Sequence, residues 1–231
     1  MSSGKVLLET RDGIMTATLH RPDKLNAIDN EMARGLLHAI GMAASNAETH
    51  VLLVRGSGHA FCAGRDVGAP PTEQDLELVQ SVAAALVALP KPVVAAVHGW
   101  TLGAGLEWAL DADLVLAAES SRFKLPEASL GVFVTGGLTA TLPAFAGLSR
   151  AKALMLLGEE FGALQAQAWG LVWQVVPDAD LDASATRVCR QLAALAPHVV
   201  SRYKKVLNEI GLGHFRRAVE AETEAQRAIH G

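Results

Sequence analysis

Residues 91–127 constrain the fold more than any other stretch, because they combine two short apolar runs with a glycine-rich turn between them. Residues 93–97 form an apolar run of the kind expected of a strand buried on both faces. Residues 103–105 read Gly-Ala-Gly, which permits a sharp turn and a close approach of the backbone to a ligand. Residues 106–110 then predict the start of a helix, and residues 114–117 predict a second buried strand.

The glycine turn at residues 103–105 is the first candidate for a catalytic site. A helix N-terminus presents unpaired N–H groups and the positive end of the helix dipole, so the N–H of Ala104 is a candidate donor to an oxyanion. Glu107 lies in the first turn of the predicted helix, and Glu127 follows the next strand. Two acids beside such a site suit proton transfer next to a carbonyl. The alternative is that Glu107 only favours the helix start and that Glu127 is a surface acid.

The rest of the chain predicts alternating strands and helices up to residue 127 and mainly helices after it. Asp12-Gly13 marks a hairpin, Asp29 is a predicted helix N-cap, and Thr72 with Asp75 forms a capping-box pattern. This order favours an α/β layered core, with a boundary near residues 177–180 before an all-helical part. The further predicted strands are residues 6–8, 14–19, 51–54 and 171–176. Further helices are predicted after Gly136-Gly137, after Ser149 as N-cap, at residues 163–169 and beyond residue 181.

Composition narrows the class of protein. The chain has 231 residues, of which half are hydrophobic and 19% are charged, so it can bury one sizeable core. A net charge of -4 provides no electrostatic footprint for nucleic acid, and no apolar run is long enough to span a membrane. No signal region follows Met1, so we expect a cytoplasmic protein. Cys62 and Cys189 form no disulfide or zinc-binding pattern, so we predict no metal site and interpret Cys62 as a buried thiol.

Four motifs follow one another along the chain. They are His20-Arg-Pro-Asp-Lys-Leu-Asn-Ala, Phe61-Cys-Ala-Gly-Arg-Asp, the segment from Lys91-Pro to Gly103-Ala-Gly-Leu-Glu, and Pro126-Glu-x-x-x-Gly. Ala166-x-x-x-Gly-Leu-Val comes after them. In this order they resemble the first adenine-side loop, the two oxyanion loops and the second acid motif of the enoyl-CoA hydratase/isomerase, or crotonase, superfamily. The likeness covers about residues 5–210.

The resemblance implies an α/β fold, in which a superhelix of ββα turns carries a helical C-terminal part. Residues 1–177 would form the spiral core with an acyl-CoA site, and residues 178–231 a helical trimerisation part. A homotrimer or hexamer is implied, and coenzyme A enters as part of the substrate with no separate cofactor. The residues that the resemblance implies in binding the substrate and its coenzyme A are Lys24, Leu25, Ala27, Ala63, Asp66, Val67, Trp100, Gly103, Phe133 and Val134.

The resemblance also implies a mechanism. The thioester carbonyl would lie between two backbone N–H groups, which by position are those of Arg65 and Ala104. Each such donor contributes about 3–4 kcal/mol in other oxyanion holes. Glu107 and Glu127 match the two acids of the hydratases, in which one acid activates a water and the other exchanges a proton at the α-carbon. We therefore expect an enoyl-CoA hydratase, with Glu107 and Glu127 in these two roles.

Two departures from the family pattern keep alternatives open. Val134 and Thr135 stand where the family commonly has Pro-Gly, so Phe133 and Val134 would reshape the acyl pocket. Family members also usually continue into a further helix beyond the point where this chain ends, so the trimerisation part is expected to be incomplete. The alternatives are an enoyl-CoA isomerase, an acyl-CoA thioester hydrolase and, more remotely, a non-catalytic scaffold that binds a partner such as RNA.

Overall fold

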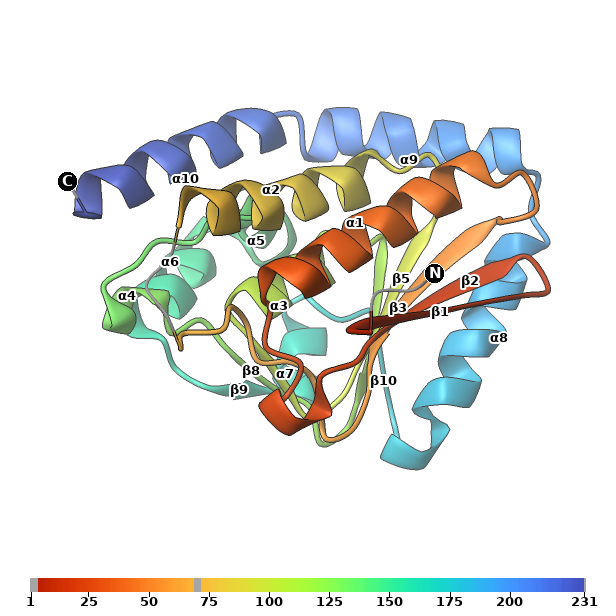
Figure 1. Ribbon diagram of the computed structural model, residues 1–231, viewed down its shortest axis with the longest axis horizontal. Coiled ribbons are helices and arrows are strands. Elements are labelled where there is room, and N and C mark those ends of the chain that lie inside the picture. Colours follow the sequence, from red (N-terminus) through yellow and green to blue (C-terminus); the bar gives the residue numbers. More distant parts are fainter. Residues whose placement is uncertain (1–3, 69–71, 231) are drawn as a thin grey trace.

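Two β-sheets, one large and one small, form the centre of the molecule, and helices cover them (Figure 1). The computed structural model describes residues 4–68 and 72–230, so residues 1–3 of the N-terminal segment considered above lie outside it. The large sheet has six strands in the order β1–β2–β3–β5–β7–β10. Its first pair is an antiparallel hairpin, and the other pairs are parallel. Its strands are β1 Val6–Arg11, β2 Ile14–Leu19, β3 Val51–Gly56, β5 Val93–Val97, β7 Leu114–Ala118 and β10 Gln174–Val176.

Three strands of the large sheet each lead into a short strand of the small sheet and then into a helix. β3 continues into β4 and α2, β5 into β6 and α3, and β7 into β8 and α4. The small sheet has the order β4–β6–β8–β9 and is parallel except between β8 and β9. This repeated ββα unit confirms the predicted α/β superhelix. The strands of the small sheet are β4 Ala60–Cys62, β6 Trp100–Leu102, β8 Arg122–Lys124 and β9 Phe161–Gly162. The helices of the three units are α2 Glu73–Ala88, α3 Ala104–Leu110 and α4 Glu127–Leu130.

The two faces of the large sheet have separate apolar cores. On one face, α8 (Leu181–Ala193) packs its buried side chains, including Val188, against strand residues such as Leu53 and Val94. On the other face, α1 (Asn30–Ser45), α2 and α3 share the larger core, which contains Met32, Leu86 and Leu106. Strand residues therefore alternate between two cores, which is why residues 51–54 of β3 and all of β5 are apolar.

Local signals in the sequence account for the starts of α1 and α2. The Asp29 carboxylate accepts the N–H of Met32 at 2.9 Å, and Thr72 and Asp75 form the predicted capping box of α2. The prediction that Ser149 caps a helix is wrong, because α6 (Leu148–Leu157) begins directly after Gly147 and contains Ser149.

The last strand is also shorter than the predicted 171–176. The N–H groups of Leu171 and Val172 bond to the carbonyl of Ala166 at the end of α7 (Ala163–Ala168), so they are not available to the sheet. Pairing begins only with β10.

Three helices form the C-terminal part, namely α8, α9 (Pro197–Gly211) and α10 (Phe215–His230). Figure 1 shows α9 and α10 following one another along one long side of the molecule. α10 contacts α2 and α5 (Leu138–Ala146), so the end of the chain returns to the region of the predicted site. Short 3-10 helices occupy Pro22–Lys24 and Asp178–Asp180. Within residues 4–68 and 72–230, no helix combines the length and apolar character needed to cross a bilayer.

Candidate active site

A cavity of about 490 Å³ lies where α2, α3, α4 and α10 meet the loop after β4. Polar groups from several elements converge on it, among them the side chains of Glu107, Glu127 and Gln226. Much of the remaining lining is apolar. The larger apolar side chains, besides Pro126, are those of Val67, Leu76, Val79, Leu130, Val132 and Phe133. An apolar cavity with a few convergent polar groups is the expected form of a site for a small molecule.

Glu107 projects from the first turn of α3 and is 2% exposed. Its carboxylate accepts the N–H of Gly136 and, at 3.3 and 3.4 Å, the N–H of Thr135. A side chain at Gly136 would collide with this carboxylate, so Glu107 would have to move to make room for it. Burial raises the pKa of Glu107 well above its ordinary value, and the neighbouring Glu127 and Glu222 raise it further, while the two amides act in the opposite direction.

Glu127 begins α4 and lines the same cavity. Its Oε1 lies so close to Gly103 that a side chain there would collide with it, and Gly103 also has a φ of 47°. Its Oε2 is buried and has no hydrogen-bond partner among the described residues. Burial raises the pKa of Glu127 to about 7, so this carboxyl can both give and take a proton near neutral pH.

The two predicted oxyanion loops are in contact. A Cβ at Gly64 would lie 2.8 Å from the carbonyl oxygen of Leu102 and 3.6 Å from the amide nitrogen of Ala104. Ala104 is the first residue of α3, and the first N–H groups of a helix have no partner within it. Arg65 and Ala104 both line the cavity. The two backbones are therefore placed on adjacent walls of one site.

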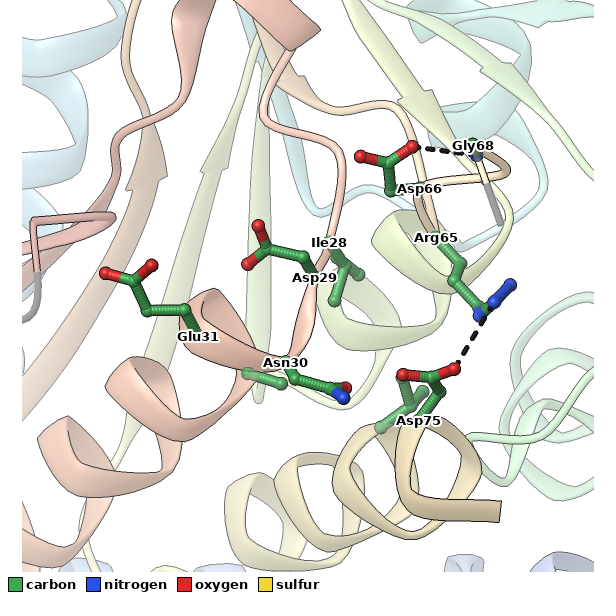
Figure 2. Close-up of a pocket in the computed structure, with 10 residues that line it drawn as sticks. Ile28, Asp29, Asn30, Glu31, Arg65, Asp66, Gly68 and Asp75 are labelled. Carbon is green, nitrogen blue, oxygen red and sulfur yellow. Dashed lines mark hydrogen bonds and ion pairs between the residues drawn. The ribbon is translucent and has the colours of Figure 1, made fainter. Parts of the chain in front are cut away.

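The Arg65 side chain extends to the start of α2. Figure 2 shows it directed at Asp75 near the start of α2, with Nη2 and Oδ2 3.4 Å apart. These two residues lie between the cavity and a second pocket of about 520 Å³, which is lined on its far side by Asp29, Asn30 and Glu31 (Figure 2). The side chain at position 65 thus shapes the boundary between the two hollows.

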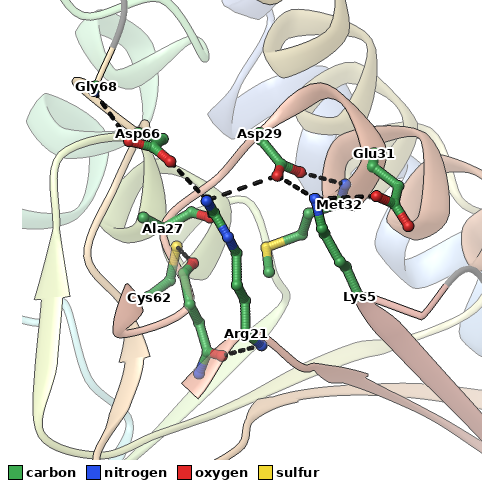
Figure 3. Close-up of polar contacts among 10 residues, drawn as sticks. Lys5, Arg21, Ala27, Asp29, Glu31, Met32, Cys62, Asp66 and Gly68 are labelled. Atoms are coloured by element: carbon green, nitrogen blue, oxygen red, sulfur yellow. Dashed lines mark hydrogen bonds and ion pairs between the residues drawn. The ribbon is translucent and has the colours of Figure 1, made fainter. Parts of the chain in front are cut away.

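The loop at residues 20–27 is tied to the loop at residues 61–66 by Arg21. Its Nη1 donates to Asp66 at 2.7 Å and to the carbonyl of Ala27 at 3.1 Å, as Figure 3 shows. The buried Asn26 donates to the carbonyls of Ser57 and Ala60, both at 2.8 Å. The N–H of Gly68 and the Arg21 guanidinium lower the pKa of Asp66, which therefore remains ionised. The first motif is thus a polar clamp that holds the cavity loop in place.

The structure brings together the two predicted acids and several of the predicted binding residues. Those that line the cavity are Ala63, Arg65, Val67, Gly103, Ala104, Glu107, Glu127 and Phe133. Asp66 lines the second pocket instead. Val134 is 4% exposed and packs into the core, so Phe133 rather than Val134 shapes this cavity. The predicted binding residues outside the lining of both hollows are Lys24, Leu25, Ala27, Trp100 and Val134.

Sequence reasoning missed three polar residues near the site. Glu222 and Gln226 come from α10, and Asp111 directly follows α3. Both carboxylate oxygens of Asp111 are buried without a hydrogen-bond partner in the described part of the chain. Burial, and then Glu107 and Glu222, raise its pKa well above the ordinary value. An acid four residues after Glu107 in an otherwise apolar helix was the available signal for Asp111.

The interpretation of Cys62 as a buried thiol is confirmed. The residue is fully buried, and its Sγ lies 3.1 Å from the carbonyl of Asn26. Burial raises the pKa of this thiol to about 12, so it stays protonated at neutral pH. Across residues 4–68 and 72–230, no group of His, Cys, Asp and Glu side chains is arranged to hold a metal ion.

The chain matches the family model described as enoyl-CoA hydratase/isomerase over residues 9–229. It is 35% identical to 1,2-epoxyphenylacetyl-CoA isomerase of Escherichia coli K12, covering 96% of this chain and 88% of that one. It is 36% identical to a probable enoyl-CoA hydratase of Rhodobacter capsulatus, covering 79% and 72%. The crystal structure of an enoyl-CoA hydratase from Mycobacterium avium subsp. paratuberculosis K-10 superposes with a TM-score of 0.92 at 30% identity, covering 97% and 89%.

Proposed function

The chain belongs to the enoyl-CoA hydratase/isomerase family, and within it we propose that the protein adds water across the double bond of a 2-enoyl-CoA to give a 3-hydroxyacyl-CoA. The observation that carries this proposal is the placement of Glu107 and Glu127 in one cavity, each held against a glycine of the opposite loop. The charge of Glu127 raises the pKa of Glu107, so the two carboxyls tend not to ionise together, and the amides of Thr135 and Gly136 donate to Glu107 and favour it as the ionised member of the pair.

The substrate's thioester oxygen would bind between the backbone N–H groups of Arg65 and Ala104. The contact between their loops supports this placement, because both line the cavity beside the acids. Donors fixed in this way stabilise the enolate-like oxygen that forms when a nucleophile adds to the enoyl group. The coenzyme A portion would then run along the loops that carry Lys24, Leu25, Ala27 and Asp66.

The two acids would divide the chemistry of hydration. Glu107, as a carboxylate, takes a proton from the water whose oxygen bonds to the β-carbon. The electron pair of the double bond moves toward the thioester, and the α-carbon receives a proton from Glu127. The net change is one added water, with Glu107 protonated and Glu127 ionised. A proton must return from Glu107 to Glu127 before the next turnover.

An isomerase is the second candidate, because one of the relatives described above is named as one. An isomerase would move a proton between two carbons and would need chiefly one of the acids. A thioester hydrolase would instead release free coenzyme A. The test is to incubate the protein with crotonyl-CoA and to identify the product by mass spectrometry, while loss of the enoyl-thioester absorbance is followed. A product heavier by one water supports hydration; a product of unchanged mass or free coenzyme A contradicts it.

Self-association is part of the same proposal. α9 exposes an apolar stripe that includes Tyr203 (68% exposed), Leu207 (66%) and Ile210 (83%). Side chains at these helical spacings lie on one face, and a second copy of the chain is the partner that the family suggests. We propose a homotrimer or hexamer that covers this stripe. Light scattering should give a multiple of the chain mass for the native protein and a smaller mass for Ile210→Glu.

A further inference from the structure

The polar side chains of α10 bind the backbone of the loop that holds Glu107. Glu222 is 1% exposed, although α10 lies at the surface of the molecule (Figure 1). Its Oε2 accepts the N–H of Gly137 at 2.7 Å, and its Oε1 accepts the N–H and the hydroxyl of Thr139 at 2.7 and 2.6 Å. One buried carboxylate thus accepts three hydrogen bonds from the start of α5.

Gln226 fixes the other end of the same loop. It lies one helical turn after Glu222, and its Oε1 accepts the N–H of Phe133 at 2.6 Å. Phe215, also in α10, occupies the space that a side chain at Gly137 would need. The loop is therefore held by α10 at residue 133, at residue 137 and at residue 139.

The amides that bind Glu107 lie between these points of attachment. Thr135 and Gly136 donate to Glu107, and the next amide in the chain, that of Gly137, donates to Glu222. Consecutive N–H groups of one loop are thereby divided between two carboxylates. If Glu222 released Gly137 and Thr139, the amides that orient Glu107 would lose their support.

We propose that Glu222 is a positioning residue for Glu107, which acts through the Gly136–Gly137 backbone, and that Gln226 assists it at Phe133. This inference rests on the proposed function where it concerns turnover, but the structural coupling stands without it. The expected consequence of removing Glu222 is a lower kcat with little change in KM, because the orientation of an acid is lost and the cavity walls remain.

The decisive variant is Glu222→Gln. It preserves the shape of the side chain, but its NH₂ group replaces one of the two oxygens that accept hydrogen bonds from Gly137 and Thr139. Thr223→Val is the matched control, because Thr223 is the next residue of α10 and its hydroxyl accepts from Gln80 of α2 instead of the loop. Hydrogen–deuterium exchange of the peptide covering residues 133–139 is measured in both variants and in the native protein. We expect exchange at Gly136, Gly137 and Thr139 to become about tenfold faster or more in Glu222→Gln and to stay unchanged in Thr223→Val.

Kinetics then test the connection to Glu107. Glu222→Gln should lower kcat in the native background and have little effect in a Glu107→Gln background, because the two residues act as a unit. Additive effects in this double-mutant cycle would overturn the proposal, and so would unchanged exchange of the loop in Glu222→Gln. If Glu222→Gln fails to fold, Gln226→Ala provides the same exchange measurement at the other attachment. Lack of hydration by the native protein, together with faster loop exchange in the variant, would refute the hydratase proposal and leave the positioning role intact.

Discussion

The carboxylates of Glu107 and Glu222 are bound by the consecutive amides of Gly136 and Gly137, although the two acids are separated by most of the C-terminal half of the chain. Both acids are almost completely buried, and each raises the cost of ionising the other acids around it. The loop amides offset part of this cost by donating to the charged forms. Loop, α3 and α10 therefore form one electrostatic unit.

Replacing either candidate acid should abolish most turnover. Glu107→Gln and Glu127→Gln are each expected to reduce kcat for hydration by about 10²-fold or more, because an amide can neither give nor take the proton. Steady-state kinetics with crotonyl-CoA provide the measurement. Glu9→Gln, on the exposed side of β1, is the control and should retain native activity. Native rates in Glu127→Gln would point to a one-acid mechanism.

The rate should depend on pH through the same pair. Turnover needs Glu107 ionised and Glu127 protonated at the same time, so kcat/KM should follow the singly protonated pair: it should fall below about pH 7, where both carboxyls become protonated, and again at higher pH, where both become ionised. The two carboxyls are coupled, and the observed values will belong to the pair. A pH–rate profile from about pH 6 to about pH 9 is the measurement. A rate that does not change between about pH 7 and about pH 6 would contradict the assignment of the acid and base roles to this pair.

The local parts of this site could be predicted from the sequence, and the distant parts could not. Glu107 and Glu127 lie close to the glycine turn in the chain, so the predicted strands and helix made them candidates, and the resemblance to the family then implied that both belong to one site. Glu222 is one of several acids in an amphipathic helix, and no local pattern tells which of them is buried. Two of its three hydrogen-bond donors are backbone amides, which leave no mark on side-chain spacing, and the third is the hydroxyl of Thr139.

The same reasoning explains the smaller errors. Ser149 has the right chemistry for an N-cap, but Gly147 ends the preceding helix and α6 starts at once. Residues 171 and 172 have strand-like side chains, but their amides are used to finish α7. In both places backbone hydrogen bonds set the boundary of the element, namely the start of α6 and the start of β10. Side-chain patterns do not reveal such bonds.

Adding one methyl group at Gly136 should lower activity while the protein still folds. In Gly136→Ala the new Cβ would collide with the Glu107 carboxylate, so we expect kcat to fall about tenfold to hundredfold from misplacement of the acid. Gly41→Ala is the matched control. It lies within α1 with no atom inside 4 Å of the new Cβ, and it should raise the free energy of unfolding by about 0.5–1 kcal/mol without affecting turnover. Native kcat in Gly136→Ala would mean that the loop does not orient Glu107.

Asp111 should make the protein less stable as the pH rises. Its pKa is raised in the folded state, so the folded protein retains a proton that the unfolded chain loses above about pH 4. Stability from this group is complete below that pH and is lost as the pH rises toward the folded-state pKa, at about 1.4 kcal/mol per unit of pKa difference. Asp111→Asn should therefore weaken the decline in unfolding free energy between about pH 5 and about pH 8. Urea unfolding at fixed protein concentration is the measurement, and an unchanged decline would show that Asp111 does not titrate in this range.

Lys204 should be the group that secures α9 to the core. Its Nζ lies 2.8 Å from Asp113 and donates to the carbonyls of Leu86 and Lys91 at 3.1 and 3.2 Å, and the residue is 8% exposed. Removing one member of a buried pair leaves the other charge uncompensated, so Lys204→Met should lower the free energy of unfolding by about 3–5 kcal/mol. Lys205→Met removes an exposed neighbour and should change it by less than about 0.5 kcal/mol. Adding Asp113→Asn to Lys204→Met should restore part of the loss, because the stranded carboxylate is then neutral. Equal effects of the two lysine variants would mean that the Lys204–Asp113 pair contributes nothing beyond surface charge.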